Sequence, residues 1–165
     1  MANWIYKIKE IEESVGKLYL MISEKTENLY PEVSELFHQL YKDEVHHSGQ
    51  VDFISSLFRE LEDSFGKCEK TLEILSERIK FIEDITGVID EKEMYLHPVE
   101  LLKIAIEIED ELGEGHELIS EAITNPELKK LIDSLAIEDR IHSQRIHDFL
   151  ESYEKGMPVL EDSQK

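Results

Sequence analysis

Four segments of the chain place acidic or histidine side chains where an amphipathic helix would bury apolar ones. At helical spacing, the stripe that contains Val15 and Ile22 is interrupted by an acid, and three later stripes are interrupted in the same way. The interrupting residues are Glu12, Glu44, His47, Glu109, Asp139 and His142. A buried carboxylate is costly unless it is paired, protonated or bound to a cation. Four carboxylates and two imidazoles match the ligands of a dinuclear metal centre, such as di-iron or di-manganese.

Spacing and placement together select the two histidines of this set. An acid three residues before a histidine lies on the same helical face and can hold one ion with it. The sequence has four such pairs, so the spacing alone is weak. Only Glu44/His47 and Asp139/His142 lie within an apolar stripe. The histidines that we expect at the surface are His38, His46, His97 and His147.

The two halves of the chain repeat the same pattern. Residues 9–23 align with residues 106–120, and residues 31–54 align with residues 126–149. The alignment superposes each proposed ligand of the first half on a proposed ligand of the second half. It also pairs Tyr19 with His116, each seven residues after a proposed ligand. These two side chains could hydrogen-bond the ligands, and plain core packing is the alternative for Tyr19.

Long helices must position these residues, because Gly (7) and Pro (4) are sparse in the 165 residues. The expected helices cover residues 3–28, 31–62, 97–124 and 126–153, three of them opening at a proline. Short turns make two antiparallel hairpins. The helical connector, about residues 63–97, is long enough to traverse the bundle and leave the second and third long helices parallel. The prediction is an all-α four-helix bundle with a crossover connection over residues 1–155, followed by a tail, 156–165.

Charge and composition exclude several classes of protein. The formal net charge of −20 argues against nucleic-acid binding and against an anionic membrane surface, and it would concentrate metal cations. We find no apolar run long enough to span a bilayer and no signal-peptide pattern near the N-terminus. The single cysteine, Cys68, excludes an intramolecular disulfide. A cytoplasmic protein is expected.

Three segments resemble the ferritin-like superfamily, and within it the rubrerythrin-like proteins. They are LYKDEVHH at residues 40–47, PVELLKIAIEIE at residues 98–109 and LAIEDRIH at residues 135–142. The resemblance extends over roughly residues 5–152. It implies a di-iron carboxylate centre that reacts with hydrogen peroxide or dioxygen. It also implies that Glu12 and Glu109 are the single carboxylates, and that the two acid-x-x-His pairs supply the other ligands.

The chain departs from this family pattern at four points. Asp139 is one methylene shorter than the usual glutamate, and His116 stands where a tyrosine is common. Ile106 stands where rubrerythrins carry an extra glutamate, which exchanges with histidine as the irons change oxidation state. No four-cysteine rubredoxin module follows the bundle, so the electrons would come from a separate protein, such as a rubredoxin.

Two classes of function therefore remain open, besides a helical interaction module without metal. The first is an oxidoreductase that uses two iron ions, with manganese or zinc as alternative metals, to reduce hydrogen peroxide or dioxygen. The second is an iron-handling or non-catalytic bundle with a degenerate metal site, which Asp139, His116 and Ile106 favour. A homodimer is expected in either case.

Overall fold

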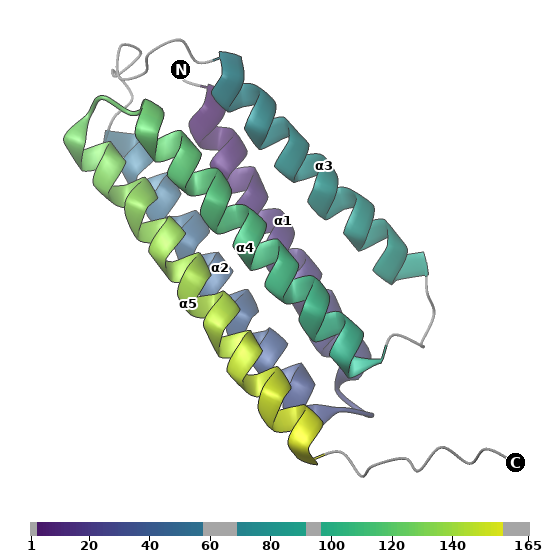
Figure 1. The fold of residues 1–165 in the computed structure, drawn as a ribbon. Helices are drawn as coiled ribbons and strands as arrows, with labels where there is room; N and C mark the ends of the chain where they lie inside the picture. The colour runs from purple at the N-terminus through teal and green to yellow at the C-terminus, as the bar shows by residue number, and fades with distance from the viewer. Residues whose placement is uncertain (1–2, 58–68, 92–96, 157–165) are drawn as a thin grey trace, which may run out of the picture.

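Five helices make up the part of the chain that the computed structural model describes, residues 3–57, 69–91 and 97–156 (Figure 1). They are α1 (Asn3–Thr26), α2 (Pro31–Leu57), α3 (Glu69–Glu91), α4 (Pro98–Ala122) and α5 (Pro126–Gly156). The predicted all-α, ferritin-like bundle is confirmed.

The helices form two hairpins joined by a crossing helix. α1 packs antiparallel against α2, and α4 packs antiparallel against α5 (Figure 1). α3 runs back along the bundle and lies against α1 and α4 (Figure 1). Because α3 spans the length of the bundle, α2 and α4 run parallel. This is the crossover connection that the sequence predicts.

Local hydrogen bonds fix the turn of each hairpin. Ser23 and Ser34 each donate a hydroxyl hydrogen bond of 2.9 Å to the other's backbone carbonyl, which ties the end of α1 to the start of α2. Asn125 caps α5, because its Oδ1 accepts hydrogen bonds of 3.0 Å from the backbone N–H groups of Glu127 and Leu128. The capped turns hold each helix in register with its neighbour.

Several predicted helix ends shift by a few residues. α1 ends at Thr26 rather than residue 28, and α4 ends at Ala122 rather than residue 124. Ile123 has extended backbone angles (φ −84°, ψ 126°) at the C-terminal cap of α4. A helical conformation is disfavoured directly before Pro126, which limits how far α4 can continue. α5 extends to Gly156, three residues beyond the prediction. Cys68 and the predicted end of the second helix lie outside the described residues.

Apolar side chains from all five helices fill the interior. Ile8, Val15 and Ile22 of α1 are almost completely buried, as the stripe of that helix predicts. Within the described ranges, no helix is both long and apolar enough to cross a membrane.

Candidate metal centre

The six predicted ligand residues meet inside the bundle. α1 supplies Glu12, α2 supplies Glu44 and His47, α4 supplies Glu109, and α5 supplies Asp139 and His142. All four carboxylate residues have an exposed fraction of 0%, and the two histidines have 1% and 5%. Charged side chains are almost never buried to this degree without a partner, so the cluster needs a compensating charge.

Two groups of three residues could each hold a metal ion. The first is Glu12, Glu44 and His47, and the second is Glu44, Glu109 and His142. Within each group, the possible ligand atoms all lie within 4.8 Å of one another. Glu44 belongs to both groups and is therefore placed to bridge two ions.

The orientation of the two histidines supports this bridging position of Glu44. His47 Nδ1 lies 3.4 Å from Glu12 Oε2 and 3.4 Å from Glu44 Oε2. His142 Nδ1 lies 3.4 Å from Glu44 Oε1 and 3.4 Å from Glu109 Oε2. Each oxygen of Glu44 thus faces a different histidine, and both histidines direct Nδ1 inward. The two rings stack, with centroids 5.3 Å apart.

Unsatisfied polar atoms test whether these residues fit a metal centre. Eight buried side-chain atoms of the cluster make no hydrogen bond within the described structure: both carboxylate oxygens of Glu12 and of Glu44, Oε2 of Glu109, Oδ1 of Asp139, and Nδ1 of His47 and of His142. Buried polar atoms are normally hydrogen-bonded, and each exception is costly. Every one of the six predicted residues contributes at least one such atom. Oxygen and imidazole nitrogen are also the donors that divalent iron and manganese accept, so the donor set fits two ions.

Asp139 is placed differently from the other three acids. Its Oδ2 lies 2.8 Å from Nδ1 of His116, and neither group of three contains it. The Nε2 atom of His116 lies 3.3 Å from Glu12 Oε1, so one buried imidazole joins two carboxylates. The sequence predicts that the shorter side chain of Asp139 reaches less far than a glutamate. Its role as a metal ligand stays a prediction, with Oδ1 as the available atom.

Tyr19 and His116 occupy equivalent positions around the cluster. Tyr19 donates a hydrogen bond of 2.6 Å to Glu109 Oε1, and His116 contacts Glu12. Each therefore contacts the glutamate of the other hairpin. Burial and the nearby charge of Glu109 raise the pKa of Tyr19 well above its ordinary value, which keeps the hydroxyl protonated as a donor.

Two carboxylates that sequence reasoning missed hold the outer nitrogens of the histidines. Glu138 Oε2 lies 2.7 Å from Nε2 of His47, and Asp43 Oδ2 lies 3.4 Å from Nε2 of His142. Asp43 is also bound at 2.7 Å by Arg145. A carboxylate on the outer nitrogen fixes the ring and its tautomer, leaving Nδ1 free to bind metal. The signal was present, because Asp43 and Glu138 are equivalent in the repeat and each directly precedes a predicted ligand.

The remaining histidines are not part of the cluster. His46, His97 and His147 are exposed, as predicted. His38 is half-buried rather than exposed, and its ring centroid lies 6.0 Å from that of Tyr41.

Histidinium ions compensate the carboxylates in the absence of metal. Burial alone would lower the pKa of His47, but its contacts with Glu12 and Glu44 outweigh this and raise the pKa to about 12. In the same way, contacts with buried acids raise the pKa of His116 and of His142 to about 10. All three imidazoles are therefore protonated near neutral pH.

The acids respond unequally to the same burial. Burial raises the pKa of Glu44 to about 8 and that of Asp139 to about 6. For Glu12, the contacts with His116 and His47 outweigh burial and lower the pKa below its ordinary value. Metal binding must displace protons from the histidines, because a coordinated imidazole nitrogen carries none.

Glu138→Ala is expected to weaken metal binding at the group that contains His47. Loss of such an outer carboxylate typically lowers metal affinity 10–100-fold, so we expect the affinity for one of the two ions to fall by roughly that factor. Isothermal titration with Mn(II) would measure the affinities, with exposed Glu154 of the same helix, changed to alanine, as the control. Equal affinities in the two variants would show that Glu138 does not support the centre.

A comparison with protein families adds independent information. The family model described as Rubrerythrin matches residues 9–98, more than half of the chain. The match includes Glu12, Glu44 and His47 and ends before the other three predicted ligands. No curated protein and no solved structure matches the chain.

Proposed function

Because the chain belongs to the rubrerythrin family, we propose that it is a di-iron oxidoreductase that reduces hydrogen peroxide, with dioxygen as the alternative oxidant. The observation that carries the proposal is the set of buried ligand atoms without hydrogen bonds, arranged in two groups that share Glu44. A structural bundle would gain stability by replacing these groups with apolar side chains. Their presence in the core supports a bound cation.

The proposed roles follow from the two groups. Glu12 and His47 would hold one ion, Glu109 and His142 the other, and Glu44 would contact both. Asp139 is proposed as the sixth ligand. Two Fe(II) ions would supply the two electrons that, with two protons, convert hydrogen peroxide to two water molecules.

The surrounding side chains would orient the ligands and hold protons. Glu138 fixes the ring of His47 and Asp43 lies beside that of His142, while Tyr19 keeps a proton on the oxygen that donates to Glu109. His116 holds a proton between Glu12 and Asp139. The burial of all four acids shields their carboxylates from bulk water. We further propose that a separate protein such as a rubredoxin returns the electrons and that the protein acts as a homodimer.

A second candidate function is iron handling by a bundle whose catalytic site has degenerated. One observation favours it: Asp139 is bound by His116 and lies outside both ligand groups. Ile106, at the position of the family's extra glutamate, packs against the apolar core and offers no ligand atom. Catalytic turnover of hydrogen peroxide or dioxygen separates the two candidate functions.

Reaction of the Fe(II) protein with each oxidant tests the proposed function. We expect two iron equivalents per chain, faster oxidation by hydrogen peroxide than by dioxygen, and a stall after one turnover unless an electron donor is added. Anaerobic stopped-flow absorbance would measure both rates. Faster reaction with dioxygen would move the assignment to a ferroxidase or oxidase. Bound iron that reacts with neither oxidant would favour iron handling.

A further inference from the structure

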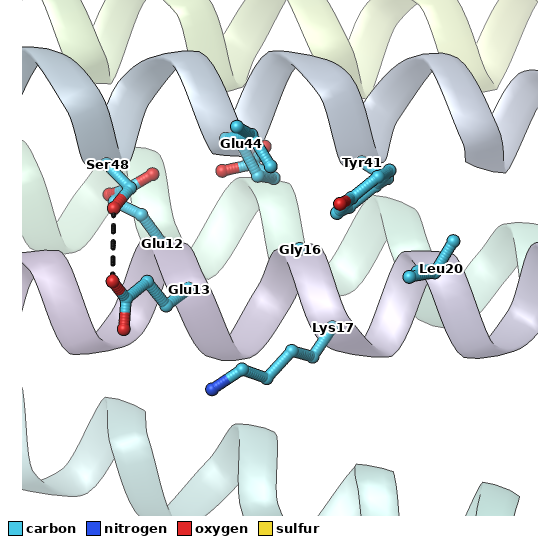
Figure 2. Close-up of a pocket in the computed structure, with 9 residues that line it drawn as sticks. Glu12, Glu13, Gly16, Lys17, Leu20, Tyr41, Glu44 and Ser48 are labelled. Carbon is cyan, nitrogen blue, oxygen red and sulfur yellow. Dashed lines mark hydrogen bonds between the residues drawn. The ribbon is translucent and has the colours of Figure 1, made fainter.

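A pocket of about 380 Å³ lies between α1 and α2 and reaches the candidate centre (Figure 2). Two of the predicted ligands, Glu12 and Glu44, form its inner end. Exposed Glu13, Lys17 and Val45 lie at its outer side. The pocket therefore extends inward to the side chains of Glu12 and Glu44, whose carboxylate oxygens are buried and make no hydrogen bond.

Gly16 makes room for this pocket. A Cβ atom at Gly16 would lie 3.2 Å from Glu44 Cβ and 3.7 Å from the ring of Tyr41. The first distance is tighter than ordinary van der Waals contact, so even a methyl group would crowd the side chain of Glu44 at its Cβ atom. Glycine at this position keeps the space beside Glu44 free of a side chain.

The equivalent place in the other hairpin is covered. Gly113 matches Gly16 and Arg140 matches Val45 in the repeat. The Cγ atom of Arg140 lies 3.7 Å from where a Cβ of Gly113 would be, and Arg140 forms an ion pair with Glu117. The two halves thus differ: a small apolar residue borders the pocket in the first, and a paired arginine lies over the glycine in the second.

The charges of the pocket suit a cation. Glu13 places an exposed carboxylate on the outer side, where Ser48 donates a hydrogen bond of 3.5 Å to it (Figure 2). Among the described residues that line the pocket, Lys17 is the one cationic residue, and in Figure 2 its side chain extends away from Glu44. Six waters occupy roughly 180 Å³ at about 30 Å³ each, so a hydrated divalent ion fits the volume.

We propose that this pocket is the route by which divalent metal ions reach the centre, with Glu13 attracting the ion and Glu12 and Glu44 receiving it. The inference rests on the proposed function, because it requires that the centre binds metal. The group of Glu12, Glu44 and His47 is then filled from the α1–α2 side.

The rate of metal uptake by the apoprotein tests this route. Val45→Trp places an indole over the pocket, and we expect Co(II) uptake to slow about tenfold or more, a barrier raised by ~1.4 kcal/mol. The final amount of bound Co(II) should not change. Ile141→Trp is the matched control, because Ile141 (57% exposed) and Val45 (54%) are similarly exposed and Ile141 does not line the pocket. Stopped-flow absorbance of the Co(II) bands gives the rates.

A second variant tests the charge without adding bulk. Glu13→Gln should slow uptake at low ionic strength, and the difference should shrink in salt, because screening weakens the attraction of an exposed carboxylate.

Uptake at the wild-type rate in both Val45→Trp and Glu13→Gln would overturn the route while leaving the proposed function intact. A Val45→Trp protein that binds Co(II) normally but reacts slowly with peroxide would also overturn it, in favour of an oxidant channel. A wild-type protein that binds no Co(II) or iron would instead contradict the proposed function.

Discussion

Glu44→Ala is expected to abolish tight binding of both metal ions, whereas His142→Ala should remove only one. The reason is geometric: Glu44 contributes an oxygen to each group of possible ligands, and His142 contributes to the second group alone. Removing a shared carboxylate also leaves the remaining imidazoles and acids without their common neighbour. Mass-spectrometric metal analysis of protein purified without chelator would measure the stoichiometry.

The matched control for this experiment is Glu10→Ala, because Glu10 is an exposed acid on α1. Like Glu44→Ala, it removes one acidic side chain and makes the formal net charge less negative by one, but it does not touch the cluster. Two ions retained in both Glu44→Ala and His142→Ala would rule out this ligand set. Loss of metal in Glu10→Ala as well would indicate nonspecific binding to the acidic surface.

The metal-free protein should become less stable as the pH rises from about 6 to about 9. The pKa values of His116 and His142 are raised from 6.5 to about 10, so their stabilising contribution is complete below pH 6.5 and is lost as the pH approaches 10. The pKa of Glu44, raised from 4.5 to about 8 by burial, acts with the same sign, because folding favours its neutral form. The lowered pKa of Glu12 has the opposite effect on stability, but only below about pH 4.5, the ordinary pKa of this group.

Bound metal should reverse or flatten this pH dependence. The ligand side chains must lose protons to bind a metal ion. Metal affinity therefore rises with pH, while the stability of the apoprotein falls. Free metal at about 100 times Kd adds about 2.7 kcal/mol, which raises Tm by roughly 5–10 °C in a domain of this size. Thermal scans at both ends of this pH range, with and without Mn(II), would measure the effect. Parallel curves for the two forms would contradict a buried centre at these histidines.

Much of the fold and the positions of the candidate ligands could be predicted from the sequence. Helical periodicity fixes which side chains share a face, so Glu12 and Glu109 had to point inward with the apolar residues around them. The length of the segment between the hairpins determined the crossover, because a short turn could not leave α2 and α4 parallel. Local chain geometry dictates each of these features.

Contacts between the hairpins could not be predicted in the same way. They depend on how far each helix is rotated about its axis and shifted against its neighbours, which periodicity does not specify. The contact between His116 and Glu12, and the contact between Glu138 and His47, are of this kind.

Several outer contacts of the centre join one half of the repeat to the other. Tyr19 of the first hairpin contacts Glu109 of the second, and Glu138 of the second contacts His47 of the first. A single hairpin therefore contains ligands without several of the groups that orient them. If the repeat arose by duplication, the ancestral hairpin could have completed these contacts only by pairing with an identical copy. The interior of this bundle then preserves an ancient interface between two chains, and α3 is the segment that made their association permanent.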